Sequence, residues 1–157
     1  MPQYSNDGML RVTIVNSIAN IAAPTAAELN AGTHVTGFLT KDGVTTPADQ
    51  NNVDVATLAD TFNAQVPGSF GGAIEMVGIR NNTVDTLWNL ITYGLTTNVV
   101  IRRGVSTASV FASAQKVEVY PVVFHEPVPQ QTGGDEASRF AISAPVNAQP
   151  NLKATVA

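Results

Sequence analysis

Two histidines and a few carboxylates are the residues of this chain whose types could do chemistry. His34 and His125 lie far apart in expected strands, so a zinc or catalytic role would need further ligands that only the fold could bring close. The chain has no cysteine, which excludes disulfides, thiolate catalysis and cysteine-ligated zinc. It also has no GxSxG, HExxH, Walker or dinucleotide-binding motif. We therefore interpret both histidines as structural and expect no enzymatic activity, no metal and no cofactor.

Two glycine-rich segments and one arginine pair have weaker chemical interpretations. The Gly-Gly-Asp-Glu stretch at 133–136 lacks the spaced oxygen ligands of a calcium loop, which indicates a solvated turn. The stretch PGSFGG at 67–72 has the glycines of a phosphate cradle without a lysine or a strand-to-helix context. Arg102 and Arg103 could contact phosphate, but their position at the end of a strand favours carboxylates on a strand or subunit edge.

Three carboxylates lie inside expected strands, where charge is normally avoided: Asp54, Glu75 and Glu118. If their strands face a shared water-filled space, these charges need no partner. The alternative interpretation is that they are solvent-facing residues of an ordinary sheet. The sequence leaves both interpretations open.

The composition describes a chain with enough apolar material for a core and few surface charges. Its 157 residues are 44% hydrophobic, which fits a single domain over 1–157. Only 13% of the residues are charged, well below the usual quarter. Because interface cores are depleted in charge, this surface suits a subunit covered by partners, and an ordinary low-charge β domain is the alternative.

Charge and hydropathy also exclude several classes of partner. The net charge is −4, and the eight basic residues are scattered apart from one adjacent pair, so we expect no stable nucleic-acid binding. No apolar segment approaches the length of a membrane-spanning helix, and the N-terminus lacks the pattern of a signal peptide. We expect a soluble product of the cytosol.

The strongest local pattern predicts one helix over about 82–93. Apolar residues recur on one face at helical spacing, at Val84, Leu87, Trp88 and Ile91. Asn82 or Thr83 can cap the first turn, and Gly94 can close the last one. A β-branched strand at 98–103 follows directly. A helix in a strand-rich chain must bury its apolar stripe on a sheet.

The rest of the chain predicts strands and turns. Thr25 and Glu28 have the spacing of a capping box, which predicts one or two turns of helix at 25–32. Lys41-Asp42-Gly43 predicts a hairpin turn, and Pro121 predicts an edge position or a bulge for its strand. The other expected strands are 10–14, 33–40, 44–46, 53–62, 73–80, 116–126, 138–144 and 152–156.

The order of these features resembles the major tail tube protein of long-tailed, siphovirus-type bacteriophages. The resemblance covers nearly the whole chain and has no catalytic signature. It rests on PTAAELNAG at 24–32, followed by a strand and the Lys-Asp-Gly turn; on the NTVDTLWNLITYG helix that leads into NVVIRRG; and on KVEVYPVVF and the terminal RFAISAPVNAQPNLKATVA.

The resemblance implies a mainly β fold, a β-sandwich or partly closed barrel flanked by the helix at about 82–93. It further implies a virion subunit, made in the cytoplasm of the host bacterium, that forms stacked six-membered rings around a hollow channel. An N-terminal arm (1–8), a long hairpin loop (41–52) and a C-terminal segment (145–157) would grip neighbouring subunits. Partners would be other copies, other tail proteins at the tube ends and DNA in transit without specific binding, with no membrane.

Individual residues take expected roles from this resemblance. The candidates for subunit contacts are Tyr4, Lys41, Asp42, Arg102, Arg103 and Leu152. The candidates for the channel lining are Asp54, Glu75 and Glu118, because a channel of the same sign as DNA offers it no adhesive phosphate contacts.

Two other function classes remain open on the sequence. A binding module, such as a phage decoration or carbohydrate-binding β-sandwich, would need exposed loop aromatics, for which Phe70 and Phe111 are the candidates. A small hydrolase has the least support, because no nucleophile, base and orienting group can be assembled. Secreted tubes of bacterial injection systems share the implied fold.

Overall fold

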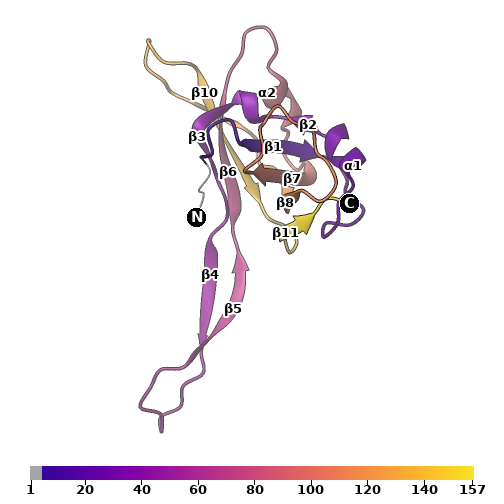
Figure 1. Ribbon diagram of the computed structural model, residues 1–157. Coiled ribbons are helices and arrows are strands. Elements are labelled where there is room, and N and C mark those ends of the chain that lie inside the picture. Colours follow the sequence, from indigo (N-terminus) through magenta and orange to yellow (C-terminus); the bar gives the residue numbers. More distant parts are fainter. Residues whose placement is uncertain (1–4) are drawn as a thin grey trace.

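The computed structural model describes residues 5–157 as two packed antiparallel sheets with a two-stranded arm (Figure 1). The five-stranded sheet has the order β11-β8-β7-β1-β2 and the four-stranded sheet the order β3-β6-β10-β9. The first comprises β1 (Leu10–Val15), β2 (Thr33–His34), β7 (Thr96–Arg103), β8 (Lys116–Val123) and β11 (Asn151–Thr155). The second comprises β3 (Leu39–Thr45), β6 (Ala73–Ile79), β9 (Val128–Gln130) and β10 (Arg139–Pro145).

The remaining elements are short, apart from the arm. They are α1 (Ala26–Ala31), the 3₁₀ turn η1 (Thr36–Phe38), α2 (Thr86–Leu90), and the arm strands β4 (Asp49–Asp54) and β5 (Gln65–Gly71). The capping box predicted for α1 is confirmed, since the Thr25 hydroxyl accepts from the Glu28 amide and the Glu28 carboxylate accepts from the Thr25 amide.

The main core lies between the two sheets, as the mainly β, sandwich-like prediction requires. It is built from the alternating inward residues of both sheets, including Val12, Ile101 and Val122 from one and Met76 and Phe140 from the other. The described strands form no closed barrel. Opposite Phe140 stands Gly78, where an added Cβ would lie 2.4 Å from the phenyl ring. A glycine is therefore required at this point of the sheet for the ring to pack.

A second core covers the other face of the five-stranded sheet. Val100, Val117 and Val119 point away from the sandwich and are covered by Leu29 of α1 and by Phe111 of the 104–115 loop. Both faces of β7 and β8 are thus covered over much of their length, which explains the apolar runs at 99–101 and 119–123.

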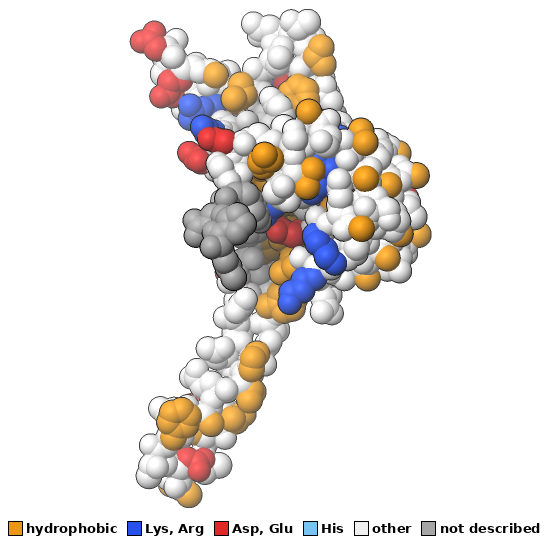
Figure 2. Space-filling view, in the orientation of Figure 1, with side chains coloured by type: hydrophobic (Ala, Val, Ile, Leu, Met, Phe, Trp, Pro, Cys, Tyr) orange, Lys and Arg blue, Asp and Glu red, His pale blue; other side chains and the backbone are white. Residues whose placement is uncertain are grey.

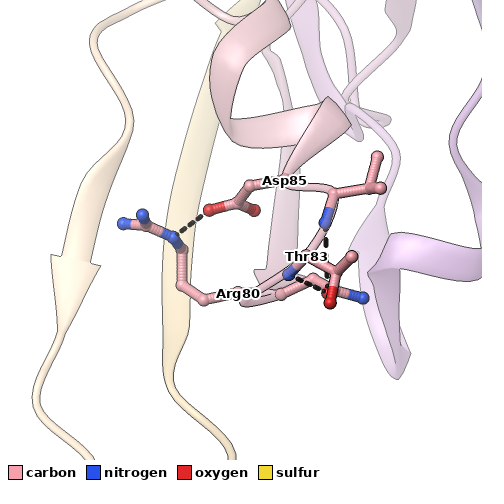
Figure 3. Close-up of polar contacts among 5 residues, drawn as sticks. Arg80, Thr83 and Asp85 are labelled. Atoms are coloured by element: carbon pink, nitrogen blue, oxygen red, sulfur yellow. Dashed lines mark hydrogen bonds and ion pairs between the residues drawn. The ribbon is translucent and has the colours of Figure 1, made fainter.

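The helix near residue 86 is much shorter than the predicted 82–93. Residues 81–84 form a turn in which the Asn81 side-chain oxygen accepts from the amides of Thr83 and Val84 (Figure 3). Asp85 is the N-cap residue, but its carboxylate pairs with Arg80 and makes no capping bond (Figure 3). The predicted caps at Asn82 and Thr83 are therefore wrong.

The apolar stripe of that helix is confirmed at only three of its four positions. Leu87 and Ile91 are buried in the main core, and Trp88 packs edge-on against Phe140 with ring centroids 5.0 Å apart. Val84 is 56% exposed. Ile91 reaches the core in an extended conformation, so the chain leaves the helix at Leu90, before Gly94. Gly94 has a positive φ of 79° but closes no helix.

The predicted hairpin turn at Lys41-Asp42-Gly43 lies inside β3 instead. The register between β3 and β6 shifts between Leu39 and Val44, so these residues form an irregular stretch of a continuous strand. A Cβ at Gly43 would lie 2.7 Å from the Val77 carbonyl oxygen. Asp42 and Gly43 therefore form part of a β-bulge. The same Asp-Gly pair is also typical of a tight hairpin turn, which is why the sequence predicted one.

The long hairpin is displaced from the predicted 41–52 to 49–71. Its strands are β4 and β5, and the tip at 55–64 has no regular secondary structure. The predicted strand at 53–62 and the predicted PGSFGG loop are both wrong, because 67–71 belong to β5. No main-sheet strand pairs with β4 or β5 among the described residues, so neighbouring strands do not impose the alternation on which the prediction depended.

Pro121 lies in β8, which is an interior strand and not an edge. The Pro121 carbonyl accepts a hydrogen bond from the Asn147 amide, on the side of β8 where β11 pairs. An N–H at Pro121 would point to that same side, but the pairing with β11 ends at Val119, so the missing donor has no partner strand there. On the other side Pro121 stands opposite Asn98 of β7. A proline is tolerated because one side of the interior strand has lost its ladder at this residue.

Candidate functional site

The β4–β5 arm is the most unusual surface of the described chain. It projects from the sandwich with no second layer beneath it (Figure 1), and nearly all of its residues are exposed. Leu58 at the tip is fully exposed and Phe62 is 76% exposed. Hydrophobic side chains follow the arm to its tip (Figure 2); the large exposed ones are Val53, Val55, Leu58, Phe62, Val66 and Phe70.

Local interactions give the arm a definite shape without burying it. Val53 stands opposite Val66 across the two strands. At the tip, the Asp60 carboxylate accepts from the amide and the hydroxyl of Thr57, and these bonds lower the pKa of Asp60. An isolated two-stranded hairpin is only marginally stable in water, so apolar side chains on such an arm require another covering surface.

A groove lies where the arm joins the sandwich. Its volume is about 510 Å³, and its walls come from the base of β4 and β5, from the 146–150 segment and from β11. Phe70 and Leu152 stand in its lining, each 53% exposed. The groove is thus an open, mainly apolar depression beside an apolar projection.

The four-stranded sheet has one face that the described chain leaves uncovered. On β6 and β10 the buried residues alternate with partly exposed ones, and the latter face away from the main core. Glu75 is the exposed carboxylate on this face, and it accepts a 2.7 Å hydrogen bond from the Ser143 hydroxyl. The five-stranded sheet has no comparable free face, because its outer side carries the second core.

The three predicted channel carboxylates occupy three different environments. Asp54 lies on the arm, where it accepts from the Ala56 amide. Glu75 is on the outer face of the four-stranded sheet. Glu118 is on the five-stranded sheet and forms an ion pair with Arg103 (2.8 Å) while accepting from the Tyr120 hydroxyl (3.1 Å). Burial, followed by the Glu118 charge, raises the pKa of Tyr120. The fold does not bring the three carboxylates together.

The predicted contact residues are placed as follows. Tyr4 lies outside the described residues. Lys41 pairs with Asp7 at 3.1 Å, with both side chains well exposed, and Asp42 is exposed beside it on β3. Arg103 of β7 donates to the Glu118 carboxylate on the neighbouring strand β8. Pairing with a carboxylate on a strand was one of the roles predicted for the arginine pair. Leu152 is exposed on β11 and lines the groove.

Arg102 has an intramolecular role. Its side chain is fully buried, and its guanidinium donates to the carbonyls of Ser106, Ser109 and Val110 and to the Gln115 side chain, at 2.7–3.0 Å. These bonds tie the 104–115 loop to β7. Its side chain offers no surface to another molecule.

Sequence reasoning missed Arg11 and the tip of the arm. Arg11 stands opposite Arg102 and donates to the carbonyls of Thr107 and Ser109, so both arginines hold the same loop. The signal for the tip was present, since Leu58 and Phe62 are large apolar residues outside the alternating positions 53, 55, 57, 59 and 61 of the predicted strand. We interpreted them as part of a strand.

No group of three or more histidines and carboxylates in residues 5–157 is arranged to hold a metal ion. His34 interacts through Nδ1 with the Val12 carbonyl (3.3 Å), while the His125 ring lies against Tyr93. Neither described α-helix has the length and hydropathy to cross a membrane.

The comparisons with known proteins give one family match. No curated protein sequence matches the chain. A family model described as phage tail tube protein matches residues 1–157, the full length of the sequence. Because this match covers the whole chain, the protein belongs to the phage tail tube protein family.

Proposed function

We propose that this protein is the repeating subunit of a phage tail tube and assembles into stacked six-membered rings around a channel for DNA. Membership of the family supports a structural role in the virion and association with other copies and other tail proteins. Ring number and DNA passage are extensions drawn from the resemblance. The subunit is synthesised in the host cytoplasm and has no enzymatic role.

The exposed apolar arm is the observation that carries this proposal. Full burial of a Leu or Phe side chain is worth about 1.5–3 kcal/mol, so covering Leu58 and Phe62 supplies a substantial driving force for association. The tip projects away from its own sandwich (Figure 1), so the covering surface belongs to another copy. A contact between two different patches of the same chain closes into a ring or propagates as a filament.

The uncovered face of the four-stranded sheet is the best candidate for the channel lining. Of the three carboxylates with this expected role, Glu75 is the one on that face. Asp54 is on the arm, and Glu118 is neutralised locally by Arg103. An acidic side chain on a channel wall repels the DNA backbone. The same face also carries Arg139 at the opposite end of β10, so Glu75 supplies the repulsion only near its own end of the sheet.

Two terminal segments complete the proposed contacts between subunits. Residues 5–8 lie against the body, with the Gly8 carbonyl accepting from the Thr107 amide and Asp7 pairing with Lys41. The 145–157 segment supplies Leu152 at the groove. Lys41, Asp42, Arg103 and Tyr4 remain proposed contact residues, whereas Arg102 is not proposed as one.

A binding module has less support than a tube subunit. It would present aromatic side chains on loops, but Phe111 is only 2% exposed and lies under the guanidinium groups of Arg11 and Arg102, with centroid distances of 5.2 and 4.9 Å. Phe70 lies on the arm next to the groove.

Negative-stain electron microscopy and sedimentation of the purified protein test this function directly. We expect rings or hollow tubes whose abundance rises with protein concentration. A variant with 50–70 replaced by a short glycine-rich turn is the matched control, and it should keep the circular dichroism spectrum of the sandwich while remaining a single copy. A wild-type chain that stays monomeric at high concentration would refute the proposal.

A further inference from the structure

The arm carries charge of one sign only. Between Lys41 and Arg80 the chain contains no basic residue, while it contains Asp42, Asp49, Asp54, Asp60 and Glu75. Asp54 and Asp60 flank the apolar tip, and both are held by local hydrogen bonds to exposed backbone amides. The tip is therefore an apolar projection with an acidic margin.

Basic residues lie on the strands beside the groove at the base of the arm, whose own lining, among the described residues, holds one carboxylate, Asp49, and no basic residue. From Ala137 to Ala157 the chain has two basic residues, Arg139 and Lys153, and no acidic residue. Lys153 follows Leu152 on β11, and Lys116 lies on the adjacent β8, with its ammonium group bonded to the Thr155 hydroxyl. Both lysines are exposed. Basic side chains also appear on the body near the root of the arm (Figure 2).

The bulge in β11 explains why that strand presents an apolar and a basic side chain together. The pairing of β11 with β8 shifts between Asn151 and Ala154, so the regular alternation of the strand is interrupted there. Leu152 and Lys153 are consecutive residues, yet both are exposed. A regular strand would turn one of the two toward the second core.

The length of the arm prevents its tip from reaching its own groove. Leu58 is eleven residues beyond Pro47, which lines the groove, and a fully extended chain of that length spans about 36 Å. Both arm strands run away from the sandwich along nearly their whole length (Figure 1). The apolar tip and the groove are therefore separate patches on one molecule, available to two different neighbours.

We propose that the tip of one subunit's arm, with Leu58 and Phe62, occupies the groove of a second copy between Phe70 and Leu152. Asp54 and Asp60 then face Lys116 and Lys153 of that copy. This inference rests on the proposed function, because it names the partner surface of the arm in the assembled tube. Each subunit has one tip and one groove. A pair of subunits joined by this contact therefore still has a free tip and a free groove, so the contact repeats from copy to copy.

The groove fits this occupant in size and chemistry. Its volume of about 510 Å³ exceeds what one leucine and one phenylalanine side chain fill, and its lining is mainly apolar. The acidic margin of the tip and the two lysines beside the groove are complementary, which fixes the orientation of the arm more than it adds affinity. Val84, near α2 at the opposite end of the body, is also an exposed apolar residue, but it does not line the groove.

Disulfide cross-linking tests the proposal cleanly, because the chain has no cysteine of its own. The variant L58C/L152C is assembled into tubes, confirmed by electron microscopy, and oxidised mildly before electrophoresis without reducing agent. We expect a ladder of covalent multimers, since each copy is linked to two others. The variant L58C/V84C is the matched control, because Val84 (56% exposed) and Leu152 (53%) are similarly accessible.

Each outcome decides between the proposal and its alternatives. A ladder with L58C/L152C, and none with L58C/V84C or with L58C alone, supports the groove as the docking site. Normal tubes without that ladder, or with an equal ladder from the Val84 control, would overturn the groove assignment and leave the tube function intact. Failure of the wild-type chain to assemble would overturn both.

Discussion

Arg102 is a completely buried charged residue that forms no ion pair within residues 5–157. Its charge is instead solvated by three backbone carbonyls and one side-chain amide of the 104–115 loop, and its guanidinium lies over the Phe111 ring. Burial, with a further contribution from the Arg11 charge, lowers the pKa of Arg102. Arg11 and Arg102 supply hydrogen-bond donors to carbonyls of the 104–115 loop, which has no regular secondary structure to satisfy them.

Replacing Arg102 with methionine should therefore destabilise the fold strongly. The substitution removes four hydrogen bonds from a charged guanidinium, and bonds of this kind contribute about 1.5–3 kcal/mol each. The Ser106 and Ser109 carbonyls keep other donors, the Ser109 amide and Arg11, so the loss is less than the full sum. We expect urea denaturation to show a loss of about 3 kcal/mol or more in the free energy of unfolding. Arg103→Met is the control, with a smaller loss because that side chain is partly exposed. Equal losses would contradict the role given to Arg102.

His34 gives the stability of the protein a pH dependence. Burial, followed by the charge of Arg11, lowers the pKa of His34 below its ordinary value of 6.5. The unfolded chain therefore binds this proton more readily than the folded one, so the contribution of His34 is complete above about pH 6.5 and declines as the pH falls below it. We expect the Tm to fall between pH 7.5 and 5.5, and to fall less in His34→Gln. The same decrease in both proteins would exclude His34 as the cause.

At the scale of elements, the arm and the helix depart furthest from their sequence patterns, for related reasons. No part of the described chain covers the arm, so its residues follow no burial period. The helix is cut to Thr86–Leu90 because Asp85 is engaged by Arg80, whose guanidinium lies 4.0 Å from the Trp88 ring centroid, and because Ile91 must reach the core. In both cases a tertiary interaction overrides a local preference.

The double variant Leu58→Ser, Phe62→Ser should separate assembly from folding. Both side chains are exposed in the single subunit, so the Tm should stay within about a degree or two of wild type, as is usual for surface substitutions. Loss of about 1.5–3 kcal/mol of burial per side chain should raise the concentration needed for assembly at least tenfold in sedimentation experiments. Leu87→Ala is the converse control, since it removes a buried side chain and should lower the Tm. Unchanged assembly in the arm variant would refute a contact role for the tip.

The whole molecule has one sheet covered on both faces and one sheet covered on one face only. The first gains its second layer from α1 and the 104–115 loop. The second presents Glu75 and its alternating neighbours outward, which is suitable for a channel wall in the proposed assembly. The projecting arm and the uncovered sheet face are both surfaces that neighbouring subunits would cover in the proposed assembly.

Glu75→Lys should leave the tube intact and impair the movement of DNA through it. The residue is exposed and its one hydrogen bond is to Ser143, so the fold and ring contacts should persist. A ring of lysines would attract phosphates and slow ejection, more so at low salt. Phage particles carrying the variant should release their DNA more slowly in a fluorescence assay, with Glu136→Lys on the 131–138 loop as control. Unchanged ejection kinetics would remove Glu75 from the channel wall.

The sequence by itself determined the mainly β class, the principal strands, the capping box at Thr25 and Glu28, and the resemblance that the family match bears out. Those features follow from local periodicity and from side chains close together in the chain. Only the tertiary structure decided that Lys41-Asp42-Gly43 forms a bulge, that Arg102 is buried, and that the long hairpin is the uncovered segment 49–71. These depend on which strands pair and which faces are covered, and contacts between distant residues set both.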